Sequence, residues 1–356
     1  MPSKSSVSAL PSPRGALLRI LILCAVLGAA LTADLALEPS DIPVRLSDVG
    51  RVLLSHTPLL HDWVAPPVSP IAEPIVWELR APRAMMAALV GCLLAIAGVA
   101  FQGLLMNPLA DPYTVGVSAG AAVGAALAEL LGWSGHWLGF GQTASAFFFA
   151  MAAIVLVYNL ARIGGRVSAQ TFLLAGVVVG TFLWSLIPLT MVLARRADAL
   201  NRIIYYLIGS LQGATWSRVI LLLPFVAIGL ILMQMLAREL NLMTLGEESA
   251  AHLGVEIERF KIKVLVIGSL MTAAAVSVSG IIGFVGLVVP HIARRLVGPD
   301  HRRVLGVAAI LGATLVVISD TAARVALGEM PVGVITSLIG APFFCLLLRR
   351  EMAKPS

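Results

Sequence analysis

The chain has 356 residues, of which 59% are hydrophobic and only 12% are charged. A typical soluble domain carries about 25% charged residues, so this charge is too low to solvate a globule of this size. The composition therefore argues against a soluble enzyme, a disordered protein or a disulfide scaffold. It predicts an all-α, polytopic membrane protein. The three cysteines lie in apolar runs without metal-ligand spacing, and we expect no metal site.

Ten apolar runs have the length and composition of membrane-spanning helices, each of which needs about 20 residues. The first begins at residue 14 and ends at Ala33; a cleaved signal peptide is the alternative there, but Leu31-Thr32-Ala33 is a poor cleavage site. The other runs cover 80–103, 114–132, 143–161, 168–194, 217–237, 261–279, 281–297, 304–326 and 331–348. Residues 1–13 and 351–356 are predicted cytoplasmic tails, and residues 14–350 form the transmembrane domain.

Four further features of the sequence predict local structure within and between these runs. Residues 34–79 are acidic and proline-containing, and we predict a long periplasmic segment. The stretch 203–213 is too short to cross and predicts a partial or interfacial helix. Gly116, Gly120 and Gly124 share one helix face, where a neighbouring helix can approach closely. The boundary between the seventh and eighth spans is weakly marked, and one of the two can be re-entrant.

The basic residues test the proposed orientation. With both termini inside, sixteen of the 25 Lys and Arg residues fall on the cytoplasmic side. This bias agrees with the excess of Lys and Arg that cytoplasmic loops carry. The net charge of +6 is therefore interpreted as topology rather than as nucleic-acid binding.

The sequence shows no device for energy conversion of its own. A phosphate-binding loop ends in Gly-Lys-Ser/Thr, and none of the four lysines follows a glycine. An ion-coupled secondary transporter, the second hypothesis, would place ionisable groups deep in its spans. The candidates are Glu129 and the i,i+4 pair Asp320 and Arg324, for which a local ion pair is the simpler interpretation. An intramembrane enzyme, the third hypothesis, would need clustered His, Asp or Glu residues within the spans, and we find no such cluster.

The loop between the sixth and seventh spans, residues 239–260, carries an informative pattern. Glu247 and Glu248 suit the N-terminus of a short helix, and Gly254 suits its C-terminal cap. A solvated connector is one interpretation of this loop. A docking lever for a cytoplasmic partner is the other.

Together these segments resemble the FecCD-type permeases of bacterial ABC importers, which carry iron chelates, haem or cobalamin. The similarity covers about residues 80–350. It rests on Arg80–Arg83, Asn107–Pro112, Gly116–Gly120, Gly246–Gly254, Gly280–His291, Gly298–Arg302, Pro331–Gly333 and Gly340–Pro342. Each motif is weak alone, but their order and spacing are specific.

The resemblance implies a type II ABC importer permease fold of ten spans. It also implies a homodimer or a paralogous permease pair, two ATPase subunits that bind ATP and magnesium, and a periplasmic or lipid-anchored substrate-binding protein. The family's ATPase contact falls here on Gly246, Glu247, Ser249, Ala250 and Gly254. Its binding-protein contact falls on Arg80, Arg83 and Arg324.

We therefore expect a non-enzymatic permease in the bacterial cytoplasmic membrane, with no cofactor of its own. Its expected substrate is an iron(III)-siderophore or related iron chelate, with haem or cobalamin as the alternative.

Overall fold

The computed structural model describes residues 13–37, 44–57, 71–164, 166–194 and 196–352. Eight helical segments in these ranges are long and apolar enough to cross a membrane. They are α1 (Pro13–Ala36), η2 with α3 (Pro74–Arg80 and Ala81–Leu104), α6 (Gly141–Ala161), α7 (Ala169–Leu193), α9 (Trp216–Met235), α12 (Ile257–Ser279), α14 (His301–Leu327) and α15 (Val332–Met352). The shorter helices α4 (Val117–Leu130) and α13 (Val285–Val297) complete the ten predicted runs. The predicted helical class is confirmed.

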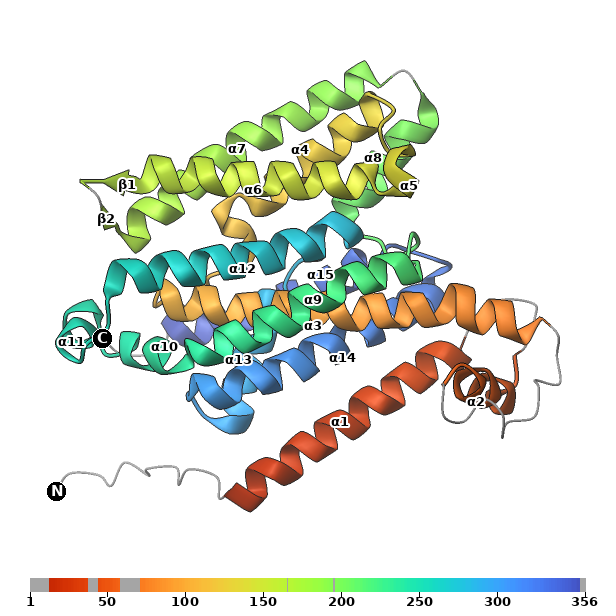
Figure 1. Cartoon of the computed structure of the whole chain (residues 1–356), viewed down its shortest axis with the longest axis horizontal. Helices are drawn as coiled ribbons and strands as arrows, with labels where there is room; N and C mark the ends of the chain where they lie inside the picture. Colours follow the sequence, from red (N-terminus) through yellow and green to blue (C-terminus); the bar gives the residue numbers. More distant parts are fainter. Residues whose placement is uncertain (1–12, 38–43, 58–70, 165, 195, 353–356) are drawn as a thin grey trace.

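The remaining elements gather at the two ends of the bundle. At one end, on the left of Figure 1, lie α10 (Ala237–Met243), α11 (Glu247–His252) and a hairpin of β1 (Arg162–Ile163) and β2 (Arg166–Val167). The hairpin is antiparallel, with Arg162 opposite Val167. At the other end lie α2 (Leu46–Ser55) and α5 (His136–Gly139). Each long helix runs between these two ends, as the predicted alternation of spans requires.

Helix α3 is the centre of the bundle. It packs against α9, α12, α13 and α14, and 94% of its apolar window is buried. Two glycine pairs allow the backbones to touch: a Cβ added at Gly91 would lie 2.1 Å from the Gly312 carbonyl oxygen, and one at Gly98 would lie 1.9 Å from that of Gly286. Such close approach is the usual role of small residues between membrane helices.

The predicted glycine face of α4 packs against α6. A Cβ at Gly120 or Gly124 would lie 2.5 Å from a carbonyl oxygen of α6, and the Ser145 hydroxyl donates a hydrogen bond to the Gly124 carbonyl. Gly116 has a different role from Gly120 and Gly124. It has a φ of 85° and forms the turn between η3 (Pro112–Val115) and α4.

The partial helix predicted over 203–213 overlaps α8 (Ala197–Ile208), which begins six residues earlier and ends at Ile208. An ion pair holds α8 against α4. The Arg202 Nε donates to Glu129 Oε2 over 2.6 Å, and the Ser134 hydroxyl donates to Glu129 Oε1. The Glu129 side chain is 1% exposed, whereas that of Arg202 is 53% exposed. Glu129 therefore has a structural partner and does not stand as an isolated ionisable group within a span.

We expect Arg202→Ala to destabilise the protein by about 1–3 kcal/mol, because it leaves the buried Glu129 carboxylate with the Ser134 hydroxyl alone. Adding Glu129→Gln should recover most of that loss, since the amide carries no charge to compensate. The thermal unfolding midpoints of the two single variants and the double variant in detergent measure the coupling. Equal midpoints for Arg202→Ala and the double variant would contradict this assignment.

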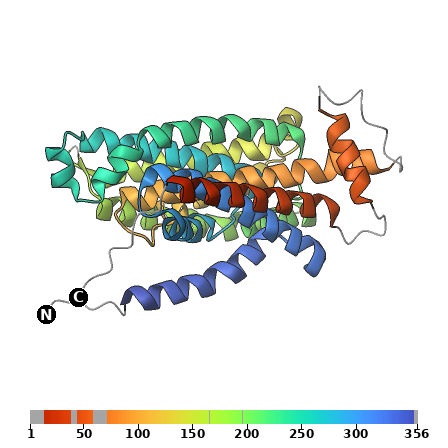
Figure 2. The same cartoon turned by 90° about the horizontal axis from the view of Figure 1, so that it is seen from below.

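Three features depart from a simple row of spans. The chain between α12 and α13 is non-helical from Gly280 to Phe284, at the weakly marked boundary. Helix α13 has 13 residues, or about 20 Å at 1.5 Å per residue, which is shorter than the hydrocarbon core of about 30 Å. Helix α15 diverges from the rest of the bundle along its length (Figure 2).

Candidate functional site

The segment predicted to contact an ATPase contains two helices, α10 and α11, where one was expected. Gly246 precedes α11 with a φ of 97°, and Gly254 follows it with a φ of 90°. Backbone N–H groups of Leu253, Gly254 and Val255 donate to carbonyls of α11 and close its C-terminal end. The predicted short helix and its glycine cap are therefore present.

The five predicted contact residues are not equally available. Ser249 and Gly254 are exposed, whereas Gly246 and Glu247 are half-buried. Ala250 is fully buried, so its methyl group packs α11 onto the bundle and does not face outward. The outward surface of α11 in this structure is formed by Glu248, Ser249, Ala251 and His252.

A buried lysine that sequence reasoning missed ties this helix to the bundle. The Lys261 Nζ donates to Glu247 Oε2 over 2.8 Å and to the Val167 carbonyl over 2.9 Å, and it lies 3.7 Å from Glu258 Oε1. Helices α11 and α12 and the β1–β2 hairpin therefore share one cation. A displacement of α11 would be carried directly into the base of α12.

We expect Lys261→Met to reduce transport several-fold more than it reduces ATP hydrolysis, because α11 loses its rigid link to α12. The measurement is substrate transported per ATP hydrolysed by the reconstituted transporter. Lys263→Met, two residues further along α12 and exposed, is the matched control. An unchanged ratio in Lys261→Met would show that the link does not transmit motion.

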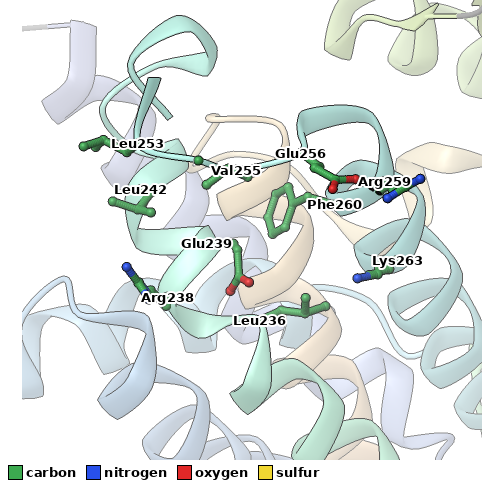
Figure 3. A pocket seen from close by; sticks show the side chains of 11 residues that line it. Leu236, Arg238, Glu239, Leu242, Leu253, Val255, Glu256, Arg259, Phe260 and Lys263 are labelled. Atoms are coloured by element: carbon green, nitrogen blue, oxygen red, sulfur yellow. Dashed lines mark ion pairs between the residues drawn. The ribbon is translucent and has the colours of Figure 1, made fainter. Parts of the chain in front are cut away.

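A pocket of about 320 Å³ opens beside this link, between α10 and α12 (Figure 3). Its lining is mixed: the apolar part is formed by Leu236, Leu242, Leu253, Val255 and Phe260, and the rest is mostly charged. The Glu239 side chain points into it from α10, and Lys263 lies on the opposite side. Arg259 lies near its edge and pairs with Glu256 at 2.6 Å. The region around α11 is therefore hollowed and charged.

At the opposite end, two of the three predicted docking arginines, Arg83 and Arg324, occur in a ladder of charges. Arg83 binds Asp320 with two hydrogen bonds of 2.8 and 3.0 Å and donates a third to Glu329 over 3.0 Å. Arg324 pairs with Asp34 and lies 3.3 Å from Asp320 Oδ2, so the predicted i,i+4 pair is present. The ladder joins α1, α3 and α14.

The structure corrects the expectation that all three arginines face outward. Arg324 is 1% exposed and Arg80 is 3% exposed, and the Arg80 guanidinium donates to the Leu35 carbonyl. Both groups are covered because the end of α1 lies over them and supplies the Asp34 carboxylate and the Leu35 carbonyl. The Arg83 side chain is 13% exposed, and its partner Glu329 is 45% exposed. Docking by these arginines stays a prediction, with Arg83 the one closest to the surface.

A third group of contacts lies inside the bundle, where α8, the break between α12 and α13, and the start of α15 meet. We call this the helix junction and define it by Tyr206–Ser210, Ser279–Phe284 and Val332–Gly333. The Ile281 N–H donates to the Tyr206 carbonyl, the Ser210 N–H to the Ser279 carbonyl, and the Gly333 N–H to the Gly209 carbonyl. Broken backbone at membrane depth occurs where protein buries it or where it lines a cavity.

Comparison with known proteins identifies the chain's relatives. Residues 18–350 match the FecCD transport family. The chain is 46% identical over 289 residues to the ABC transporter permease protein YvrB of Bacillus subtilis, covering 79% of this chain and 80% of that protein. It is 45% identical over 278 residues to the cobalamin import system permease protein BtuC of Halobacterium salinarum, covering 78% of this chain and 74% of that protein.

A solved structure gives the same result for the fold. It is described as an ABC transporter of metal-chelate type in an inward-facing conformation, and it superposes with a TM-score of 0.80 at 26% identity. The superposition covers 94% of this chain and 99% of that one. Sequence motifs, helix arrangement and relatives agree, and the chain belongs to the FecCD transport family as a transmembrane permease of an ABC importer.

Proposed function

We propose that this permease carries a metal chelate inward across a bacterial cytoplasmic membrane, with α10 and α11 on the cytoplasmic side. The observation that supports the direction of coupling is the Lys261 link between α11 and α12. An ATPase subunit that moves α11 would thereby move the spans. ATP and magnesium are bound by that subunit, because this chain has no Gly-Lys-Ser/Thr motif.

The substrate proposal keeps an iron chelate as first choice and haem or cobalamin as the alternative. The likeness to a transporter described as of metal-chelate type supports the class, and the relative named for cobalamin import supports the alternative. Uptake of labelled ferric siderophore, haem and cobalamin by cells expressing the chain with its ATPase subunit and binding protein tests both. Transport by this chain alone, driven by an ion gradient, would overturn the proposal in favour of a secondary transporter.

A second copy of the chain is the proposed neighbour of α15. This helix leaves the bundle and exposes large apolar side chains, among them Leu338 at 64% and Leu346 at 63%. The mass of the detergent-solubilised permease, determined by light scattering, should be that of a dimer. A monomer that retains transport would contradict this proposal.

Docking of the binding protein is proposed to use Arg83, with Glu329 as an internal competitor for its guanidinium. Two carboxylates compete for Arg83, and the one from Glu329 is the more exposed. An incoming carboxylate of the binding protein would therefore take the place of Glu329 and leave the Asp320 pair intact.

We expect Glu329→Gln to tighten binding-protein affinity by about 1.4-fold to fivefold, which corresponds to the 0.2–1 kcal/mol of an exposed ion pair. The dissociation constant for the permease in nanodiscs measures this. Glu73→Gln, an exposed acid near the same end, is the control. Weaker binding by Glu329→Gln would show that Glu329 assists docking and does not compete with it.

A further inference from the structure

A second pocket, which the proposed function does not use, is lined by residues that include Gln102, Asn107, Arg294, Pro299 and His301. It has a volume of about 230 Å³ and lies at the end of the bundle that carries α10 and α11. Its polar lining comes from four separate parts of the chain. These residues are Gln102, Asn107, Thr244, Arg294 and His301.

Arg294 is the charged group of this pocket, and a neutral side chain holds it in place. Its guanidinium donates to the Gln102 side-chain oxygen. The Gln102 amide nitrogen donates to the carbonyls of Gly286 and Leu287, at 3.3 and 3.2 Å. These two acceptors fix the orientation of the amide, so its oxygen must face Arg294. The cation is positioned without being neutralised.

In the described ranges of the chain, no carboxylate oxygen lies within 4.0 Å of Arg294. The nearby acid Asp300 is engaged elsewhere: its Oδ1 accepts hydrogen bonds from the Asn241 amide at 2.7 Å and from the Arg302 N–H at 3.1 Å. Burial acts to raise the pKa of Asp300, but these hydrogen bonds and the charges of Arg303 and Arg302 bring it below its ordinary value. Asp300 therefore stays ionised as the cap of α14.

The rest of the pocket is rigid. Asn241 Oδ1 accepts hydrogen bonds from the His301 N–H at 2.9 Å and from His301 Nδ1 at 2.8 Å. These two hydrogen bonds hold the imidazole in place. Arg294 is thus a preorganised, half-buried cation with no carboxylate within 4.0 Å among the described residues, which suits it to an incoming anion. Arg can hold a carboxylate with two parallel hydrogen bonds.

The position of the pocket indicates where that anion comes from. Two of its walls belong to α3 and α13, most of whose residues are buried in the bundle. Another wall includes Thr244, the first of the three residues between α10 and α11. A protein that covers α11 would also reach Arg294.

We propose that the Arg294 pocket receives a carboxylate side chain of the ATPase subunit, as a second contact beside α11. This inference rests on the proposed function, in which an ATPase subunit covers that end of the bundle. The two contacts would fix the subunit at two points on the permease. A rotation of the subunit would then act on α13 and α14 as well as on α12.

The test compares Arg294→Gln with Arg295→Gln, a change at the neighbouring exposed arginine of the same helix. Affinity of the purified ATPase subunit for the permease in nanodiscs is expected to fall about tenfold or more in Arg294→Gln, as for loss of a charge-pair partner at an interface. It should change less than about twofold in Arg295→Gln, as expected for an exposed group. Arg294→Lys keeps the charge and should lose less than Arg294→Gln, which separates loss of docking from a folding defect. Equal affinities of Arg294→Gln and Arg295→Gln would overturn the inference.

Further experiments identify the anion and distinguish failure of this inference from failure of the proposed function. Charge reversal in Arg294→Glu should be rescued by one Asp or Glu→Arg change on the ATPase subunit, and failure of every such change would overturn the inference. If inorganic phosphate stabilises the wild-type permease but not Arg294→Gln, while binding of the ATPase subunit is unaffected, the pocket is a site for a free anion. That result would also overturn the inference. Ser249→Arg on the exposed side of α11 should block ATPase binding if the proposed function holds. If Ser249→Arg binds the ATPase subunit normally, the proposed function is contradicted. If Ser249→Arg loses this binding while Arg294→Gln keeps it, only the Arg294 contact is contradicted.

Discussion

Replacing Arg324 with methionine is expected to lower the free energy of unfolding by about 3–5 kcal/mol, the range for removing one partner of a buried ion pair. The guanidinium lies between Asp34 and Asp320, and all three side chains are almost completely buried. Methionine fills much of the same volume but leaves two carboxylates without that cation. Arg83 would still bind Asp320, so Asp34 is the carboxylate that is left without a compensating cation.

A second substitution makes this prediction specific. Asp34→Asn in the Arg324→Met background should recover more than half of the loss, because the amide needs no counter-charge. The thermal unfolding midpoints of the single and double variants in the same detergent give the coupling energy. A midpoint for Arg324→Met close to that of the wild type would contradict the assigned role. So would the absence of any recovery in the double variant.

The same ladder limits what charge reversal can report about docking. Arg80, Arg83 and Arg324 were all expected to receive acidic residues of a binding protein. Reversal of Arg324 to glutamate would place three carboxylates around one buried site and disturb the fold itself. A loss of stimulation by the binding protein in that variant would therefore say nothing about an interface. Glu329 and Arg83 offer the cleaner test, because they lie at the open end of the ladder.

The sequence predicts features that depend on neighbours along the chain. Ten apolar runs correspond to ten helices, since hydropathy over about 20 residues measures the property that the bilayer selects. The partial helix α8, the short helix α11 and the Asp320–Arg324 pair are local in the same sense. Each follows from spacings of a few residues, for which helix geometry gives the outcome directly.

The features that were missed depend on contacts between distant parts of the chain. Asp34 and Arg324 are 290 residues apart, and no local spacing predicts their pairing. Lys261 looks like a topological charge at the start of a span, yet it is buried because Glu247 and the Val167 carbonyl converge on it. A lone acid near the end of an apolar run, such as Asp34, was the available signal that a partner existed within the membrane.

The helix junction is where a single methyl group is expected to have the largest effect on transport. A Cβ added at Gly333 would lie 1.7 Å from the Ile208 carbonyl oxygen and 3.2 Å from that of Ile281. Both contacts are backbone, so no side-chain rotation can relieve them. Gly333→Ala must therefore displace the start of α15 from α8 and from the break between α12 and α13. We expect transport to fall to background.

Two comparisons decide whether the junction is responsible. Gly306→Ala lies inside α14 with no atom within 4 Å of the added Cβ, and it should be neutral or stabilise by up to about 1 kcal/mol, as expected for Gly→Ala in a helix. Gly280→Ala approaches the same junction from the opposite side, with its Cβ 2.2 Å from the Tyr206 carbonyl oxygen and a φ of 69° that disfavours alanine. It should reproduce the defect of Gly333→Ala.

The measurements must separate a misfolded protein from a folded one that no longer transports. Elution as a single species, thermal midpoint and basal ATP hydrolysis with the ATPase subunit report the first, and substrate uptake reports the second. Helices α3, α12 and α14 are held by contacts outside the junction, so Gly333→Ala should retain the assembled bundle and hydrolysis while uptake is lost. Uptake by Gly333→Ala equal to that of Gly306→Ala would show that the contact is not needed for transport. If Gly333→Ala no longer elutes as a single species and also loses basal ATP hydrolysis, the helix junction is required for folding, because α15 is attached to α8 through it.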